Sequence, residues 1–349
     1  MEYAAVIIPT LNRKKHLERC IESLKAGTLA SQTDLYISVD FPPSEKYKNG
    51  YKDVLDYVKT IIGFASINVF YQESNLGPGL NRKFLEEKIA DTHDKYVFTD
   101  DDNEFSPNFL EYINWGLETY KDDESIYAVC SCTDFKIKKD SNSDFFLNTS
   151  YNPYGSGHWL HKNRKCSEYL VQSSIDHIYK SKEMQNKLYT YSPMVYMWVA
   201  QDSLRRVAPM RGRNDKLTYI DIWENVYIII NNMKCVKPTR PKSRNWGLDG
   251  SGIHANINDV ENYIPETKLD PMSDWIANPK RLDEYDEKIN EELHRNKFSI
   301  SDSERNKCEF LFSLNALFGN HFVYGVFSML KGSYHKILNK NESTKIMYG

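Results

Sequence analysis

The stretch Tyr96-Val-Phe-Thr-Asp-Asp-Asp-Asn-Glu-Phe-Ser-Pro-Asn-Phe109 decides the fold of this chain. Its first four residues form an apolar run that predicts a short buried strand, and three consecutive carboxylates, Asp100 to Asp102, follow directly. Ser106 and Pro107 then have the residue types of a helix N-cap and a first helical residue. Because ligands of open α/β sheets gather beyond the carboxyl ends of strands, we expect the three carboxylates at a cleft.

These three carboxylates, called here the aspartate triplet, favour a cation-binding site. Adjacent carboxylates repel one another unless solvent or a hard cation neutralises them. A solvated acidic turn is the plain alternative. The position after a buried strand favours Mn²⁺ or Mg²⁺ together with a nucleotide diphosphate. The triplet therefore indicates an enzyme that uses a nucleotide sugar.

The alternation of strand and helix continues on both sides of the triplet. Apolar runs predict further strands at 3–9, 35–39, 67–71 and 126–130. Apolar residues recur at helical spacing between these runs, and the turn Asn75–Gly79 separates the third strand from the next helix. This order predicts an α/β fold with a mostly parallel sheet and helices on both of its faces.

The second half of the chain is less regular. We expect residues 134–165, which are polar and turn-rich, to form a long excursion near the cleft. Residues 219–230 predict a strand or a helix leading into a buried helix, and residues 238–258 predict a loop. Apolar spacing predicts a charged covering helix over 281–296.

Composition excludes several classes of protein. The net charge of −3 lacks the basic excess of a nucleic-acid binder, so we expect no nucleic-acid partner. Six cysteines without a Cys-x-x-Cys pair predict reduced thiols and no zinc ribbon. The chain enters its first strand without a basic and apolar leader, so we expect a cytoplasmic location.

Further motifs accompany the triplet in a fixed order, namely Val6-Ile-Ile-Pro-Thr-Leu-Asn-Arg13, Asp40, and Asn75-Leu-Gly77 with Asn81-Arg82. Together they resemble the GT-A glycosyltransferases, including the large family-2 group. Asp101 to Tyr112, Asp221-Ile-Trp223 and Pro241-Lys-Ser-Arg244 are also similar to segments of the inverting N-acetylglucosaminyltransferases that act on mannose, namely N-acetylglucosaminyltransferase I and its protein-O-mannose relative. Those relatives usually have Glu where this chain has Asp100. They also carry a membrane anchor, which we do not expect in this protein.

The resemblance implies roles in binding the donor. Asp102 would bind the metal directly, while Asp100 and Asp101 would hold the ribose or metal-bound water. Asp40 would accept hydrogen bonds from uracil, with a turn or cap Asp as the alternative. Arg82 would pair with the diphosphate, with an ordinary surface Arg as the alternative. The other donor-site residues are Pro9, Thr10 and Arg13 at the base pocket, Asn12 beside them, and Asn75, which with Gly77 mainly shapes the turn.

The resemblance also implies the catalytic residue. Asp221 would be the general base, with Glu224 and Asp215 as competitors and a helix cap as the plain alternative. Trp223 would pack on the sugar. Trp198 would form a wall of the donor pocket, unless it packs in the core.

A lid is expected in the glycine-rich stretch 247–252. Arg244, Ser251 and His254 lie in or beside it and would close over the donor. His254 would complete the metal shell, with an exposed His as the alternative. The Gln-x-x-Arg-Trp signature of processive polymer synthases is missing, which predicts one sugar per encounter.

The tail carries a candidate contact surface. Residues 310–330 contain no charged side chain but are interrupted by Asn, His and Gly. This pattern argues against a transmembrane helix and leaves open a membrane surface, a sister subunit or the chain's own domain as the partner of 308–340.

We therefore expect a metal-dependent inverting glycosyltransferase with a GT-A fold and a helical C-terminal extension. Residues 1–132 would bind the nucleotide sugar, residues 133–260 would form the acceptor-side and catalytic half, and residues 261–349 the extension. A UDP-sugar would be the donor and a glycan or lipid-linked glycan the acceptor, in surface polysaccharide biosynthesis at the inner face of the plasma membrane. The alternatives are a sugar nucleotidyltransferase and a non-catalytic glycan-binding protein with this fold. The former would normally carry a Gly-rich basic loop after the first strand, which this chain lacks.

Overall fold

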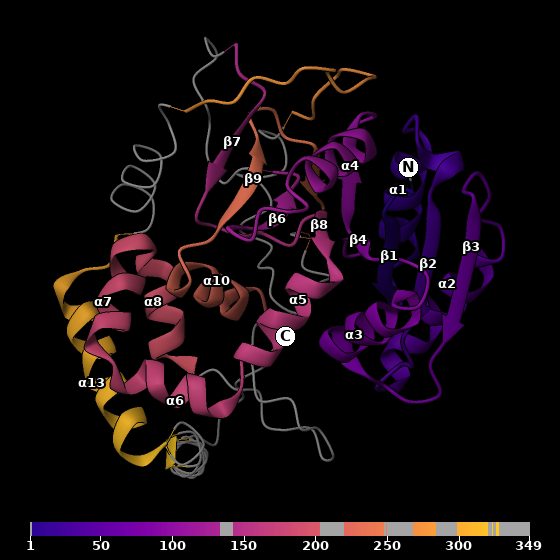
Figure 1. Cartoon of the computed structure of the whole chain (residues 1–349). Helices are drawn as coiled ribbons and strands as arrows, with labels where there is room; N and C mark the ends of the chain where they lie inside the picture. Colours follow the sequence, from indigo (N-terminus) through magenta and orange to yellow (C-terminus); the bar gives the residue numbers. More distant parts are fainter. Residues whose placement is uncertain are drawn as a thin grey trace. The chain divides into compact units, whose positions relative to one another are not determined.

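The computed structural model describes residues 2–132, 142–202, 220–247, 249, 268–283, 299–319, 323, 326 and 327. The chain divides into two compact units (Figure 1). The first consists of residues 1–167 and 231–291, and the second of residues 168–230 and 292–349. The functional division at residues 132 and 260 expected from the sequence stays a prediction.

The first unit is built on an eight-stranded sheet with the order β3-β2-β1-β4-β8-β6-β9-β7. Its parallel part, β3-β2-β1-β4, holds the strands predicted around the triplet. β8 pairs antiparallel with β4 and β6, β6 pairs parallel with β9, and β7 pairs antiparallel with β9. The bounds are β1 Ala5–Thr10, β2 Asp34–Val39, β3 Ser66–Tyr71, β4 Lys95–Phe98, β6 Ile126–Cys130, β7 Phe145–Asn148, β8 Ser156–Trp159 and β9 Lys234–Pro238.

Helices cover both faces of this sheet, which explains the continuous apolar run of β1. Val6 and Ile8 face a core shared with α1, α2 and α4, while Ala5 and Ile7 face the core shared with α3. A strand buried on both faces has no polar side, so its residues do not alternate. The bounds are α1 Lys14–Lys25, α2 Lys48–Val58, α3 Gly77–Ile89, α4 Phe109–Thr119 and α5 Leu160–Tyr169, with 3-10 turns at Ala30–Gln32 and Glu45–Tyr47.

A two-stranded antiparallel sheet adjoins the triplet. β5, Asn103–Phe105, pairs with β10, Ser243–Asn245, so that Arg244 lies opposite Glu104 and Asn245 opposite Asn103. The backbone N–H of Ser106 continues the pairing by donating to the carbonyl of Lys242 at 2.9 Å. This sheet brings a segment that is 140 residues distant in sequence next to the triplet.

Two sequence predictions about local structure were wrong. Ser106 does not cap α4, because the helix begins at Phe109 with Asn108 as its N-cap residue, and the Ser106 hydroxyl donates to Asn108 Oδ1 at 2.9 Å. The stretch 134–165 is more than an excursion, since its described part from residue 142 contains β7, β8 and the start of α5. Its polar residues are accommodated inside the sheet, where Ser156 and His158 are buried and bonded to one another.

The second unit is helical. Its described helices are α6 Gln172–Lys180, α7 Lys182–Tyr191, α8 Pro193–Ala200, α10 Ile220–Ile230 and α13 Asp302–Phe318. Residues 219–230 were predicted as a strand or a helix, and from Ile220 they form the helix α10. α13 begins with a capping box between Ser301 and Glu304 and buries Cys308, Leu311 and Phe312. Among the described residues, no helix combines the length and the apolar character needed to cross a bilayer.

Two expectations fall largely outside the described residues. Only residues 281–283 of the predicted helix at 281–296 are described, and the tail segment is described continuously only as far as Gly319. The six cysteines are all described, and all are buried thiols that form no disulfide.

Candidate functional site

The triplet lies where parallel strands end. β2, β1 and β4 are neighbours with parallel register, so their carboxyl ends share one edge of the sheet. Thr10 ends β1, Asp40 follows β2 and Asp100 follows β4 after Thr99. The sequence motifs that were expected to act together therefore converge at this edge, where α/β folds bind ligands.

Two of the triplet carboxylates are held by residues that follow β1. Thr10 Oγ1 donates to Asp101 Oδ2 at 2.7 Å. Arg13 Nη2 donates to Asp101 Oδ1, and Arg13 Nη1 lies 2.9 Å from Asp102 Oδ2. One guanidinium thus spans two neighbouring carboxylates. Asp100 is different, because its carboxylate makes no hydrogen bond or ion pair with any described residue.

The burial of these adjacent charged groups shifts their pKa values. Burial and the charges of Asp102 and Asp101 raise the pKa of Asp100 to about 7, against the opposing effect of Arg13. Burial also raises the pKa of Asp101, although the charge of Arg13 counteracts the rise. For Arg13, burial lowers the pKa, but the charges of Asp101 and Asp102 outweigh burial and hold the guanidinium protonated. The site therefore holds more negative charge than its own cation neutralises.

The second side of Asp102 is formed by β10 and the residues after it. Asn245 Nδ2 donates to Asp102 Oδ1 at 2.7 Å and to Asn103 Oδ1 at 2.8 Å. The backbone N–H of Trp246 donates to the carbonyl of Asp102 at 2.8 Å. At Gly247 a Cβ atom would collide with Asp102 Oδ2, so a glycine is required where the chain passes the carboxylate. Sequence reasoning missed Asn245, because a single Asn in a loop carries no signal of its own.

Arg244 belongs to an aromatic and charged cluster beside Asp102. Glu104 Oε2 accepts from Arg244 Nη2 at 2.6 Å and from Trp246 Nε1 at 2.6 Å. The guanidinium groups of Arg19 and Arg244 lie 4.1 and 4.6 Å from the centre of the Trp246 ring. Such cation–π contacts fix the ring orientation. Sequence reasoning selected Arg244 but missed Glu104, Trp246 and Arg19.

Asp40 and Asn75 organise the turn before α3. Asp40 Oδ1 accepts from the backbone N–H groups of Phe41 and Leu76, and Asp40 Oδ2 accepts from Gly77 N at 2.7 Å and Asn75 Nδ2 at 3.1 Å. Gly77 has a φ of 74°, a conformation that glycine adopts without strain. These bonds support the turn role that the sequence left open for Asp40, and the contact with a base stays a prediction.

Arg82 is not the ordinary surface residue considered as its alternative. It is 7% exposed, its Nε donates to Glu86 Oε1 at 2.8 Å, and its guanidinium lies 4.2 Å from the centre of the Phe98 ring. Glu86 also accepts from Tyr96 OH at 2.6 Å. A buried Arg is therefore positioned next to the strand that leads to the triplet, and its pairing with a diphosphate stays a prediction.

The remaining predicted residues lie at the edge of the sheet, in the second unit, or outside the described residues. Pro9 lies in β1 opposite Ser38, and Asn12 lies in the loop between β1 and α1. Asp221 and Trp223 lie on α10 and Trp198 on α8, all in the second unit. Trp223 is 1% exposed and belongs to that unit's core, which favours packing over contact with a sugar. Asp215, Ser251 and His254 lie outside the described residues.

The triplet fits a divalent cation that also binds a ligand. No group of three or more His, Cys, Asp or Glu side chains is arranged as a complete metal cage within the part of the chain that the structure describes. Mg²⁺ and comparable hard cations are usually held by one or two carboxylates, with phosphate oxygens and water completing the shell. Asp102, with the unpartnered carboxylate of Asp100 two residues before it, supplies such an incomplete set of oxygen ligands.

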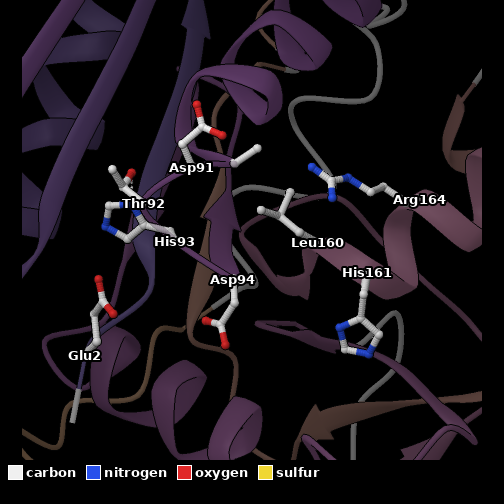
Figure 2. A pocket seen from close by; sticks show the side chains of 9 residues that line it. Glu2, Asp91, Thr92, His93, Asp94, Leu160, His161 and Arg164 are labelled. Carbon is white, nitrogen blue, oxygen red and sulfur yellow. Dashed lines mark hydrogen bonds between the residues drawn. The ribbon is translucent and has the colours of Figure 1, made fainter.

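A recess elsewhere on the first unit is distinct from this site. It has a volume of about 400 Å³ and is lined by residues that include Asp91, His93, Asp94 and Arg164 (Figure 2). His93 Nε2 lies 3.2 Å from Asp34 Oδ2. Residues 91–94 precede β4 and Asp34 begins β2, so the recess lies at the amino ends of the strands, opposite the edge that carries the triplet.

Comparison with known proteins gives one family and several weak structural likenesses. Residues 5–168, a little under half of the chain, match the family model described as glycosyl transferase family 2. No curated protein matches the sequence at a significant level. Among solved structures, TarS from S. aureus is 13% identical with a TM-score of 0.34, over 47% of this chain and 29% of that one.

Two other solved structures have a similarly low sequence identity and TM-score. The mannosyltransferase PcManGT from Pyrobaculum calidifontis, in complex with GDP-Man and Mn²⁺, is 15% identical with a TM-score of 0.34, over 48% of this chain and 46% of that one. A second S. aureus TarS structure, in complex with UDP, is 13% identical with a TM-score of 0.35, over 47% of this chain and 49% of that one. The chain thus spans less than half the length of these structures, and TM-scores of this size carry no weight for its function.

The family match coincides with the observed architecture. The matched residues contain the parallel strands β1 to β4, the helices between them and the triplet at their carboxyl edge. The α/β layout and the position of the acidic motif are those expected from the sequence. Residues 5–168 are therefore similar to glycosyl transferase family 2 both in sequence and in the order of their strands and helices.

Proposed function

We propose that the protein is a metal-dependent, inverting glycosyltransferase that moves a sugar from a nucleotide-diphosphate donor, a UDP-sugar, to a glycan or lipid-linked glycan acceptor. The observation that carries this proposal is the aspartate triplet at the end of β4, beside Thr10 and Arg13. The family match of residues 5–168 supports the same class of reaction. It speaks against the sugar nucleotidyltransferase considered from the sequence.

The triplet would hold the donor through its diphosphate. Asp102 would bind Mn²⁺ or Mg²⁺, and Asp100 and Asp101 would hold the ribose or metal-bound water. When bound, the metal would offset the negative charge that develops on the leaving nucleotide. The chain's own contribution is to fix the carboxylates, which Thr10, Arg13 and Asn245 do by hydrogen bonds.

The base pocket and the diphosphate contacts would lie along the same edge. Pro9 and Thr10 are the last two residues of β1, Asn12 and Arg13 follow that strand, and Asp40 follows β2. Arg82 would pair with the diphosphate. Arg244, which lies on β10, would contact the donor from that strand. Asp221 remains our candidate for the base that takes the proton of the acceptor hydroxyl, with His254 as a further metal ligand and Ser251, Trp198 and Trp223 as donor contacts. A lipid-linked acceptor at the inner face of the plasma membrane would be consistent with the apolar sequence of residues 310–330.

A panel of nucleotide sugars tests the proposal. The full chain is incubated with each donor and Mn²⁺, and release of the nucleotide diphosphate is followed with and without candidate acceptors. We expect slow release with one donor or a few related donors and faster release with the correct acceptor. A chain that binds and turns over no nucleotide sugar would be a glycan-binding protein or scaffold, and the proposal would be wrong.

A further inference from the structure

Arg13 occupies the position of a counter-ion at the triplet. It is the residue before α1, at the end of the loop that follows β1. Its Nη1 lies 2.9 Å from Asp102 Oδ2, and its Nη2 donates to Asp101 Oδ1. The side chain is 20% exposed, whereas those of Asp101 and Asp102 are 5% and 11% exposed. The guanidinium thus covers the two carboxylates from the solvent side.

Asp102 is consequently engaged at both carboxylate oxygens. Asn245 donates to Oδ1 at 2.7 Å, and Arg13 lies against Oδ2. The two partners differ in charge. The neutral amide of Asn245 orients the carboxylate and is compatible with a cation on the remaining lone pairs. The positive guanidinium of Arg13 repels any second cation that approaches the same oxygen, because like charges a few ångströms apart in a partly buried site are weakly screened.

We propose that Arg13 is an internal counter-ion that competes with the divalent cation for Asp102, so that metal binding requires the guanidinium to leave the carboxylate. This inference rests on the proposed function, because it concerns the same metal. It reassigns Arg13 from the wall of a base pocket to a residue that controls metal occupancy. A released guanidinium would stay at the carboxyl end of β1, where an anionic ligand such as a nucleotide diphosphate would offer it a new partner.

The geometry predicts the direction of the effect. With Arg13 present, the cation must displace an ion pair, which weakens binding of the metal alone. Removal of the guanidinium leaves Asp101 and Asp102 without their cation, so a divalent ion gains both a vacated oxygen and a stronger attraction. We expect the affinity for Mn²⁺ alone to rise about fivefold, equivalent to about 1 kcal/mol.

The experiment titrates the full chain with Mn²⁺ alone, in the absence of nucleotide, and reads the free ion by electron paramagnetic resonance. The variants are Arg13→Met and Arg13→Lys, whose single ammonium cannot bridge two carboxylates. Lys15→Met is the matched control, since Lys15 also belongs to α1 but is exposed and makes no ion pair with a described residue. It removes one positive charge two residues from Arg13.

We expect Arg13→Met to bind Mn²⁺ more tightly than the wild type, Arg13→Lys to be intermediate and Lys15→Met to change binding less than about twofold. Circular dichroism checks that each variant is folded, and Arg13→Lys decides the question if Arg13→Met does not fold. Equal or weaker Mn²⁺ binding by a folded Arg13 variant, or an equal gain in Lys15→Met, would overturn the inference.

A parallel titration with UDP and Mn²⁺ separates the two proposals. If the wild type binds UDP with Mn²⁺ but the Arg13 variants gain nothing, only the counter-ion role fails. If neither wild type nor variants bind Mn²⁺ in any form, the proposed function fails with it.

Discussion

The side-chain amide of Asn245 donates a hydrogen bond of 2.7 Å to Asp102 Oδ1, across a two-stranded sheet that joins residues far apart in the sequence. The same amide donates to Asn103, and its oxygen accepts from the backbone N–H of Gly247 at 2.9 Å. Asn245 therefore has its donors and acceptor in use and its rotamer fixed. The orientation of the candidate metal ligand depends on the pairing of β5 with β10.

We predict that Asn245→Ala weakens Mn²⁺-dependent binding of UDP by about tenfold or more, as loss of a hydrogen bond to a metal ligand does in other metal sites. The affinity is measured by calorimetry with and without Mn²⁺. Asn68→Ala is the control, because Asn68 lies on the edge strand β3 and its amide donates to the Ser66 hydroxyl of the same strand. Unchanged metal-dependent affinity in Asn245→Ala would show that the amide does not orient Asp102. This loss is opposite in sign to the gain expected for Arg13→Met, because the amide is neutral and does not compete with a cation.

A second prediction concerns stability. Lys242 Nζ, on a side chain 1% exposed, pairs with Asp270 Oδ2 and lies 3.1 Å from Asn108 Oδ1. This ion pair ties the segment after residue 268 to the residue before β10. We predict that Asp270→Asn lowers the free energy of unfolding by about 3–5 kcal/mol, the usual cost of leaving one partner of a buried pair charged. Chemical denaturation at neutral pH measures the loss.

The effect of Asp270 should depend on pH. Burial raises its pKa, but hydrogen bonds from Lys242, Asn108 and the backbone N–H of Met272 outweigh burial and lower it overall. A carboxyl whose folded pKa lies below its unfolded value stabilises the fold above the unfolded pKa of about 4, and the stabilisation is lost as pH falls through the folded pKa. The difference between wild type and Asp270→Asn should therefore shrink below about pH 4. A difference that stays constant down to pH 3 would contradict this explanation.

We predict that Asp221→Asn keeps its affinity for the nucleotide and loses transfer by about 10²–10⁴-fold, the range expected for removal of a general base. Donor binding is measured by calorimetry and transfer by release of nucleotide diphosphate. Asp176→Asn provides the comparison, since Asp176 lies on α6 in the same unit and accepts a hydrogen bond from Gln172 of the same helix. A fully active Asp221→Asn enzyme would remove Asp221 as the base and direct attention to Glu224.

The parallel half of the fold was predictable from the sequence because its signals are local. The strands β1, β2, β3 and β6 appear as apolar runs, and the observed β6 has the bounds expected, Ile126–Cys130. Every residue of β1 and β6 is buried, so burial and sequence pattern agree in these two strands. The break between β3 and α3 also follows from the Asn75–Gly79 motif, although α3 already begins at Gly77.

The parts that escaped prediction depend on contacts between distant residues. β5 and β10 contain three residues each and have no apolar periodicity, so only their mutual pairing defines them. The start of α4 was wrong by two residues because Asn108, not Ser106, takes the cap position, and its amide is held by Asp270 at 3.1 Å. β7 and β8 were missed because buried polar residues such as His158 and Ser156 satisfy one another inside the sheet.

In the candidate site, too, the local motifs were predictable from the sequence and the contacts between distant residues were not. The motif around the triplet identified Asp100 to Asp102 and the loop after β1, since both belong to short contiguous segments. The partners that hold the carboxylates, above all the ion pair of Arg13 with Asp102, are tertiary contacts over 89 positions of sequence and carry no local signature.

The central claim is that Asp102 holds a divalent cation that binds the pyrophosphate of the donor. It is tested most directly by calorimetric titration of the full chain with UDP in the presence and absence of Mn²⁺. We predict that Mn²⁺ strengthens UDP binding by about tenfold or more and that Asp102→Ala abolishes this enhancement. Binding of UDP that is indifferent to Mn²⁺ in the wild type, or an enhancement that survives in Asp102→Ala, would contradict the account.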